Sequence, residues 1–296
     1  MCHAGSGLLP PCLTGHDSCA LCGCCCSNGA AMCQECLRTR LGLVRQSPAP
    51  PHSPSWSLAG EGRGSLPPSY VLRMPPVLAQ GHINACAVNA AANALNYQLR
   101  RTVSGTRQVG QVGQVGRVSR VSRMFMYYAA RHHIMKVADL SPDVGCSLRD
   151  VCNAVSAYGA CDERVWPYSR KLIGKHPPPS VYEAARTLPR VRYEGMAQTL
   201  PHLVDCLLRG RPVVLGMSVF TNIRDARHTG VLSMPGPDDV HLGGHAVVLC
   251  GYDMRTRFFR IQNCWGARWG DEGYMDMPFE YVLSPVLCWD IWVFRV

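Results

Sequence analysis

The chain has 296 residues, of which 47% are hydrophobic and 17% charged, and this is enough for one two-lobed domain or two small ones. It contains no apolar run of about 18 residues, which excludes a membrane-spanning helix. The first residues, MCHAGSGLLPPCLTG, lack the basic and apolar stretches of a secretory signal. We therefore expect a protein without a membrane span that is intracellular or virion-associated.

The formal net charge of +10 is unevenly distributed. Residues 1–99 carry +2 (5 Arg, 3 acids), residues 100–136 carry +8 (7 Arg, 1 Lys), and residues 137–296 carry 17 charges of each sign. The excess belongs to one segment, so the fold as a whole is not expected to bind nucleic acid. An anionic partner for residues 100–136 stays open.

Nine of the 17 cysteines lie within residues 1–36. The pairs Cys19/Cys22 and Cys33/Cys36 have the spacing of a zinc site, although the neighbouring cysteines blur the choice of ligands. The alternative is a Cys-rich segment without defined structure. The other eight cysteines are scattered, and without a secretion signal we expect them to be reduced and mostly buried.

Composition divides the chain into three parts. Residues 1–45 form the Cys-rich segment, and residues 46–68 are so rich in Pro, Ser and Gly that they predict a linker. A folded domain is predicted over 69–296. Within it, residues 107–123 (RQVGQVGQVGRVSRVSR) repeat every three residues, which gives no amphipathic face and predicts a low-complexity surface insertion.

The first half of the domain has helical patterns. Residues 86–100 are Ala-rich with near-helical spacing, and a second helical pattern follows over 124–135. A third helix is predicted over 147–159, with Ser147 as its N-cap and Gly159 as its stop.

The second half has short β-branched runs punctuated by glycine. These runs, at 212–219, 246–252 and 258–262, predict strands. Helices followed by strands favour an α+β protein with two lobes.

Cys86 stands at the start of the first predicted helix, where the helix dipole favours a thiolate. Asn84 could cap that helix. Gln80, six residues before the cysteine, could donate its side-chain amide to an oxyanion, with the Cys86 backbone N–H as a second donor.

A cysteine nucleophile needs a base that is distant in sequence and close in space. His245 follows two glycines and enters the apolar run AVVLCGY. Asn263 lies 18 residues later, at the end of the next predicted strand, so an antiparallel pair would bring the two side chains together. Trp265 could shield their hydrogen bond from water.

The stretches QGHINAC, GGHAVVLCGYD and QNCWGARWGDEGY together resemble the motifs of the papain-like cysteine peptidases, the C1 family. The resemblance spans about residues 69–296 and is strongest to the compact members found in bacteria and large DNA viruses. It implies an α+β fold with a helical lobe, a strand-rich, β-barrel-like lobe, and the active cleft between them.

The same resemblance implies a cysteine-type peptidase that hydrolyses peptide bonds through a thioester acyl-enzyme. It implies Cys86 as nucleophile, His245 as base, Asn263 as the group that orients the imidazole, and Gln80 in the oxyanion hole. The expected substrate is a peptide or protein, and no cofactor or metal is expected at the site.

The chain departs from the family pattern at two positions. Asn84-Ala85 replaces the Gly-Ser before the nucleophile, and Cys264 replaces the Ser after the asparagine. Asn tolerates positive φ better than most residues, which could preserve the loop. Two alternatives stay open: another acyl-transfer enzyme on the same site, such as a ligase or amidase, and an inactive papain-like binding module. His132 and His133 are expected to be ordinary surface residues.

Overall fold

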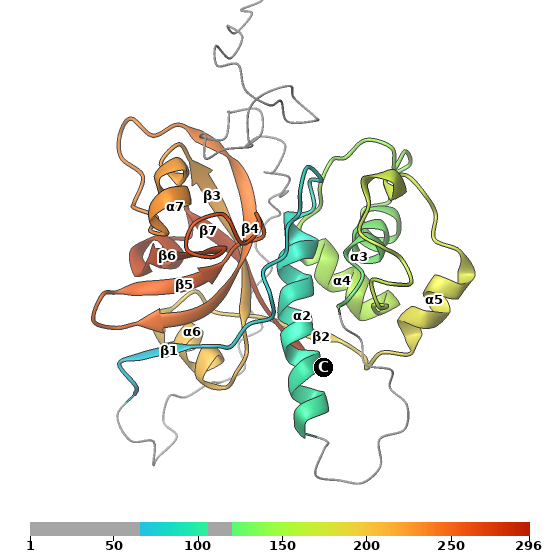
Figure 1. The fold of residues 1–296 in the computed structure, drawn as a ribbon, viewed down its shortest axis with the longest axis horizontal. Helices are drawn as coiled ribbons and strands as arrows, with labels where there is room; N and C mark the ends of the chain where they lie inside the picture. Colours follow the sequence, from blue (N-terminus) through green and yellow to red (C-terminus); the bar gives the residue numbers. More distant parts are fainter. Residues whose placement is uncertain (1–65, 106–119) are drawn as a thin grey trace, which may run out of the picture.

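The computed structural model of the protein describes residues 66–105 and 120–296. They form two lobes on either side of one long helix, α2 (Cys86–Gly105) (Figure 1). The predicted Cys-rich segment with Cys19, Cys22, Cys33 and Cys36, most of the linker and most of the repeat lie outside the described residues. No helix in the described ranges is long and apolar enough to cross a membrane.

One lobe is built on an antiparallel sheet of seven strands. The order is β2-β7-β3-β4-β5-β6, and β1 pairs with the end of β4. The long strand β4 pairs with β3 over its first part and with β1 over its last three residues. The strands are β1 (Ser69–Val71), β2 (Arg192–Gly195), β3 (Val213–Phe220), β4 (His241–Asp253), β5 (Phe258–Gln262), β6 (Tyr274–Pro278) and β7 (Cys288–Arg295).

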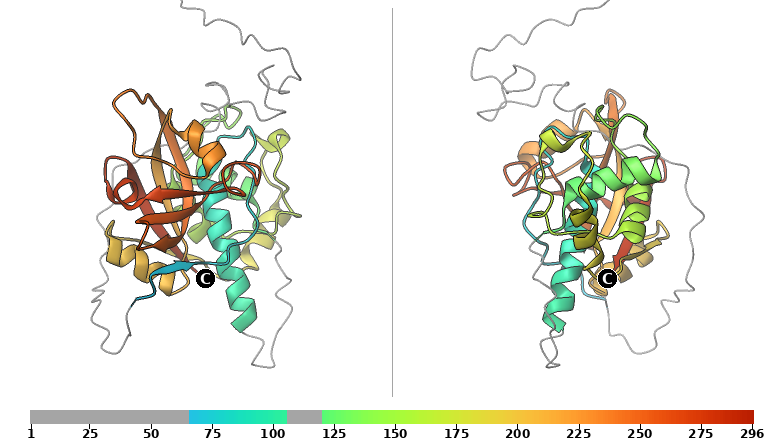
Figure 2. Two further views of the ribbon diagram at one scale, coloured as in Figure 1. Left: turned by 60° about the vertical axis from the view of Figure 1, so that its left-hand side comes forward. Right: turned by 90° about the vertical axis from the view of Figure 1, so that its right-hand side faces the viewer.

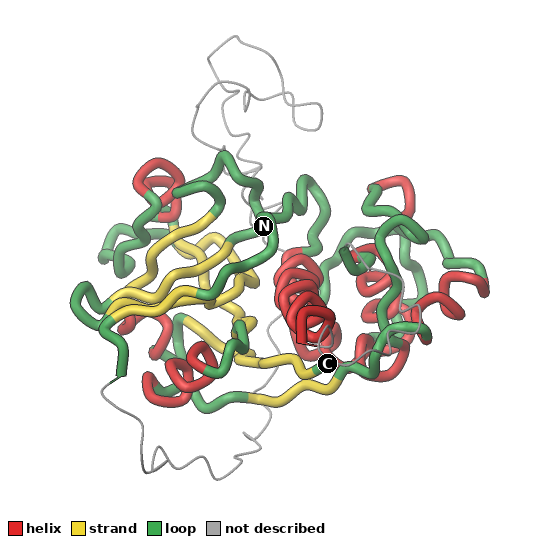
Figure 3. Tube along the Cα trace, turned by 60° about the horizontal axis from the view of Figure 1, so that its bottom comes forward, coloured by secondary structure: helices red, strands yellow, loops and turns green. Residues whose placement is uncertain are grey.

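The other lobe is helical, and it faces the viewer in the right-hand view of Figure 2. Figure 3, coloured by secondary structure, shows α2 between the yellow strands and the remaining helices of this lobe. Three short helices accompany the sheet instead. The helical lobe holds α3 (Arg123–Ala129), α4 (Leu148–Tyr158) and α5 (Pro179–Arg186), and the sheet lobe holds α6 (Leu200–Leu208), α7 (Ile223–Thr229) and α8 (Phe279–Leu283).

Helix α4 shows how local sequence sets the ends of a helix. The Asp150 backbone N–H donates to Ser147 Oγ at 3.0 Å, and the Ser147 N–H donates to Asp150 Oδ2 at 3.2 Å, so each residue caps the other. The helix ends at Gly159, whose φ is 77°. A Cβ there would lie 2.3 Å from the Ala185 carbonyl oxygen, so only glycine fits.

The predicted helices and strands are confirmed, and with them the α+β class with two lobes. One predicted helix differs in detail. The segment predicted as a helix over 124–135 starts as α3 and continues as a π-helical turn, Ala130–Ile134. All eight cysteines of the described ranges are free thiols and buried, as expected.

Helix α2 is buried over its first three turns, and its alanines let both lobes approach closely. Three asparagines at helical spacing on the same face are also buried, and together they bond to both lobes. Asn89 Oδ1 accepts from Arg123 Nη1 at 2.8 Å, Asn93 Nδ2 donates to Gln262 Oε1 at 2.8 Å, and Asn96 Oδ1 accepts from the Val121 N–H at 2.9 Å. The helix is therefore bonded to the helical lobe and to β5 by polar contacts that can all form at only one position of α2 relative to the two lobes.

Two arginines of the basic segment 100–136 are buried and bonded inside the helical lobe. Arg123 is 5% exposed and forms a two-point ion pair with Glu163, whereas Arg131 is 2% exposed and donates to the Pro142 carbonyl. Their charges serve internal contacts. An anionic partner for this segment stays a prediction, and these two residues would not contact it.

His132 and His133 are not ordinary surface residues, and that prediction is wrong. They are half-buried in the π-helical turn and pack with His176, with ring centroids 4.7 Å apart for His132–His133 and 5.2 Å apart for His132–His176. His133 Nε2 is hydrogen-bonded to the Tyr182 hydroxyl at 2.9 Å. Burial, followed by the neighbouring histidines and Lys136, lowers the pKa of both His132 and His133.

Replacement of Asn93 by Ala should reduce the free energy of unfolding by about 1–3 kcal/mol, because Gln262 Oε1 loses its buried donor. Urea denaturation of the two proteins measures this difference. Thr102→Ala, at the exposed end of the same helix, is the control and should change stability by less than about 0.5 kcal/mol. Equal stability of Asn93→Ala and wild type would contradict the role assigned to this bond.

Acid should destabilise the histidine cluster. A lowered folded-state pKa means that the fold favours neutral imidazoles. Their contribution to the free energy of unfolding is therefore complete above the unfolded pKa of about 6.5, and it is lost as pH falls through the lower folded-state pKa. Melting temperatures at pH 7.5 and 5.0 test this. The double variant His132→Gln/His133→Gln should lose less Tm over that interval than wild type, and an equal loss would exclude the cluster as a cause.

Candidate active site

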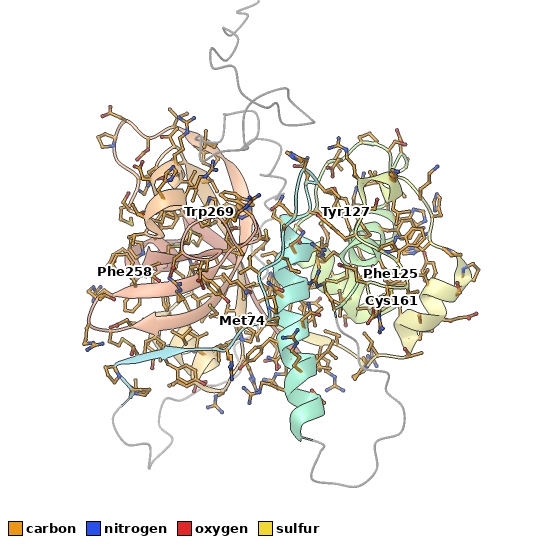
Figure 4. The ribbon with its side chains drawn as sticks, in the orientation of Figure 1. Met74, Phe125, Tyr127, Cys161, Phe258 and Trp269 are labelled. Carbon is orange, nitrogen blue, oxygen red and sulfur yellow. The ribbon has the colours of Figure 1, made fainter. Side chains whose placement is uncertain are left out.

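The N-terminal end of α2 lies where the two lobes meet, with Tyr127 of the helical lobe on one side and Trp269 of the sheet lobe on the other (Figure 4). Cys86 is the first residue of this helix and is buried. The partial positive charge of a helix N-terminus favours a thiolate at this position.

Two neighbouring strands bring His245 and Asn263 together. His245 lies in the first half of β4, opposite Met217 of β3, and Asn263 follows the last residue of β5. The antiparallel pairing of β4 with β5 places His245 Nε2 2.8 Å from Asn263 Oδ1. Both side chains are 1% exposed, so water does not compete for this bond.

The contacts of Asn263 fix the tautomer of His245. Asn263 Oδ1 also accepts a hydrogen bond of 2.7 Å from the Cys264 backbone N–H, which can only donate, so the atom that faces His245 is the amide oxygen. An oxygen acceptor requires a proton on His245 Nε2. The other ring nitrogen, Nδ1, is then the one whose proton can be exchanged in a reaction.

Trp265 packs on the imidazole, as the sequence led us to expect. Its ring centroid lies 4.5 Å from that of His245, with the rings tilted by 32°, and Trp269 packs edge-on against Trp265 at 5.2 Å. Both indoles are buried. Trp265 therefore covers one face of the histidine and restricts its rotation, and Trp269 packs behind Trp265.

Gln80 is brought to the same place by backbone pairing between distant segments. The Gln80 N–H donates to the Cys264 carbonyl at 2.8 Å, and the Gly266 N–H donates to the Leu78 carbonyl at 3.2 Å. The Gln80 amide Nε2 donates to the Ile83 carbonyl at 2.9 Å, and Oε1 accepts from the Cys264 thiol at 3.1 Å. Cys264, which replaces the family's Ser, thus helps to orient this side chain.

A buried cation supports the Gln80 segment, and the sequence did not reveal it. Arg123 Nη1 donates to the Ala79 carbonyl at 3.1 Å, and its guanidinium lies 3.7 Å from the centre of the Tyr168 ring. The Tyr168 hydroxyl donates to the Gln80 carbonyl at 2.8 Å. The fork of a guanidinium suits such simultaneous contacts, but no spacing rule links residues this far apart in the chain.

Asn84 does not act as the predicted cap of α2. Its side-chain Nδ2 donates to the Asp143 carbonyl at 2.7 Å, and its Oδ1 accepts no hydrogen bond from the described residues. The left-handed conformation considered from the sequence is also absent, because Asn84 has no positive φ. The residue instead bonds across to the loop before α4.

The thiols elsewhere in the described ranges are suited to packing and not to chemistry. Burial is the main cause that raises the pKa in each case, to about 11 for Cys161 and about 12 for Cys206 and Cys250. The pKa of Cys146, which is raised by burial and then by Cys86, is also well above its usual value. A protonated buried thiol is a poor nucleophile. The same holds for Cys152 and Cys288.

Comparisons with known proteins identify the family of the chain. The family model of the papain family cysteine proteases matches residues 144–281, a stretch that includes His245 and Asn263. An uncharacterised peptidase C1-like protein of Acanthamoeba polyphaga mimivirus is 30% identical over 243 residues, which is 76% of this chain and 72% of that protein.

Solved structures show the same fold. Xylellain, a cysteine protease from Xylella fastidiosa, is 29% identical with a TM-score of 0.69, covering 87% of this chain and 97% of that one. Digestive procathepsin L 3 of the Tenebrio molitor larval midgut is 16% identical, with a TM-score of 0.58. The match covers 90% of this chain and 80% of the procathepsin chain. The architecture is that of a papain-like thiol peptidase.

The chain belongs to the papain family of cysteine proteases and is a cysteine peptidase. The predicted resemblance to compact bacterial and viral members is confirmed by the Xylella and mimivirus proteins.

Proposed function

We propose that the chain hydrolyses peptide bonds with Cys86 as nucleophile, His245 as acid and base, Asn263 as the orienting group and Gln80 as an oxyanion donor. The observation that carries the proposal is the buried 2.8 Å bond from His245 Nε2 to Asn263 Oδ1. Asn263 is followed by Cys264, whose carbonyl accepts from the Gln80 N–H, so residues 263–264 hold both the candidate base and the candidate oxyanion donor.

Acylation follows from this arrangement. The Cys86 thiol gives its proton to His245 Nδ1, and the resulting thiolate attacks the carbonyl carbon of a peptide bond. The oxygen that becomes negative accepts from the Gln80 amide and the Cys86 backbone N–H. His245 gives the proton on Nδ1 to the leaving amine. The carbon–nitrogen bond breaks, the new amino terminus departs, and the acyl group stays on Cys86 as a thioester.

Deacylation uses the same groups in reverse. Neutral His245 takes a proton from water at Nδ1, and the hydroxide attacks the thioester while the same two donors bind the oxyanion. The carbon–sulfur bond breaks and the carboxylic acid leaves. Asn263 keeps the Nε2 proton in place through both steps, which leaves Nδ1 as the exchanging nitrogen.

We propose residues 69–296 as the peptidase domain, with a peptide or protein as its substrate. The two residues before this boundary also contact the sheet, since the Pro67 carbonyl accepts from the Tyr252 hydroxyl at 3.1 Å and the Pro68 carbonyl from the Met254 N–H at 2.8 Å. A domain that begins at Leu66 keeps both bonds.

Cys86→Ala should abolish peptide turnover and leave the fold intact, because the thiol carries the chemistry and Ala suits a helix. A peptidyl epoxide should label wild type once and not label the variant, as read by intact-protein mass. Cys206→Ala, which removes a buried thiol from α6, is the matched control and should keep both labelling and turnover.

Other outcomes of this experiment identify the alternatives. Turnover by Cys86→Ala equal to wild type would refute the proposed nucleophile. A folded wild-type protein that is neither labelled nor active would be a binding module. If an added amine acceptor captures most of the acyl group, the joined product identifies a peptide ligase on the same site.

His245→Ala should approach the loss seen for Cys86→Ala, roughly 10³-fold or more in kcat/KM, because His245 transfers protons in both steps. Asn263→Ala should lose less, about 10- to 100-fold, since it removes one orienting bond. Steady-state kinetics on one peptide compare the two variants, with folding checked by circular dichroism. A larger loss for Asn263→Ala, with both proteins folded, would reverse the assigned roles.

A further inference from the structure

The segment before Cys86 is bonded at two points to Asp143, which is 59 residues away. The Asn84 backbone N–H donates to Asp143 Oδ2 at 2.9 Å, and the Asn84 side-chain Nδ2 donates to the Asp143 carbonyl at 2.7 Å. A bond from the main chain and a bond from the side chain fix both the position and the orientation of the Asn84 peptide. Asp143 lies in the loop between the π-helical turn and α4.

Asp143 is itself held by the core of the helical lobe. The Tyr127 hydroxyl donates to Asp143 Oδ1 at 2.5 Å and accepts from the Gly145 N–H at 3.0 Å, so it bonds the loop on both sides of Val144. Tyr127 is 1% exposed, and burial raises the pKa of Tyr127 far above its usual range, which keeps the hydroxyl a donor.

Buried Arg131 holds the same loop one residue earlier. It donates from Nη2 to the Pro142 carbonyl, and its guanidinium lies 4.9 Å from the centre of the Tyr127 ring. The contacts form a chain from α3 and the π-helical turn, through the loop, to Asn84. Every member is a side chain or backbone group with defined geometry, so the loop has little freedom to shift.

The position of Asn84 matters because Cys86 is two residues further on. The Cys86 N–H is the second oxyanion donor of the proposed reaction, and its sulfur is the nucleophile. A donor aimed at the transition state loses much of its effect when it is displaced by about 1 Å. Asn84 occupies the place where the motif of the papain-like peptidases has Gly, and a glycine would have no side chain to bond to Asp143.

We propose that Asp143 is a positioning residue for the nucleophile: through Asn84 it holds the Cys86 thiol and N–H in register with His245 and Gln80. This inference rests on the proposed function. The carboxylate contacts neither the substrate nor the reacting atoms. Its two oxygens accept from Asn84 and Tyr127 and so join the nucleophile segment to the helical core.

Asp143→Ala should lower kcat about 10- to 100-fold with KM changed by less than about threefold, since transition-state contacts are lost and ground-state binding is kept. The kcat is expressed per active site titrated with the peptidyl epoxide, so unfolded protein does not enter it. Asp139→Ala is the matched control. It removes an exposed carboxylate from the same loop, where Asp139 Oδ1 accepts from the Ser141 N–H at 2.9 Å, and it should leave kcat unchanged.

Asp143→Asn should recover most of the lost kcat. Its amide oxygen can still accept from the Asn84 N–H, and its NH₂ can donate to the Tyr127 hydroxyl. Recovery by Asn and loss with Ala identify the hydrogen bonds as the cause. A role in stability alone would lower Tm and leave kcat per titrated site at the wild-type value, and that result would overturn the proposal.

If Asp143→Ala does not fold, Tyr127→Phe supplies the test, because it keeps the buried ring and removes the hydroxyl that holds Asp143 and Gly145. It should show the same fall in kcat at nearly constant KM, and wild-type kinetics would overturn the proposal. No turnover by wild type overturns the proposed function and this inference together. Wild-type kcat in Asp143→Ala overturns this inference alone.

Discussion

The rest of the structure depends on the buried polar contacts of helix α2. Asn89, Asn93 and Asn96 lie on one face of a helix that is otherwise rich in alanine. Asn89 and Asn96 are bonded to the start of α3 and the residues just before it, and Asn93 is bonded to β5. Apolar contacts alone would tolerate small shifts of the helix, since they are non-directional. A buried amide that loses its partner destabilises the fold by about 1–3 kcal/mol, so α2 has one favourable position between the lobes.

That single position matters because the candidate active site draws on both lobes. Cys86 is carried by α2, whereas His245 and Asn263 are carried by the sheet. Gln80 belongs to a segment that pairs with the chain after Asn263, and that segment is also bonded to Arg123 of the helical lobe. The candidate nucleophile, base and oxyanion donor are therefore placed by the same contacts that join the lobes.

Charge in this protein is used inside the fold as well as on its surface. Arg123 pairs with Glu163 and also reaches Asn89, the Ala79 carbonyl and the Tyr168 ring, which satisfies a guanidinium that would be expensive to bury alone. Arg131 supports the loop that holds Asp143. Arg123 and Arg131 both belong to residues 100–136, the segment with the largest net charge. The net charge counted along the sequence therefore overstates the charge that an external partner could contact.

The sequence by itself determined the elements and the chemistry of the candidate site. Ser147 and Asp150 set the start of α4 through a local bond, and the Ala-rich run predicts α2. The motifs that contain Cys86, His245 and Asn263 predict a thiol peptidase. Each of these signals lies within a few residues of the sequence or within a known motif. Only the tertiary structure decided how these parts are held. The bonds of Asn93 to Gln262, of Asn84 to Asp143 and of Cys264 to Gln80 join residues 59 to 184 positions apart. Such contacts depend on where the packed chain brings side chains together, and no local propensity or periodicity encodes that.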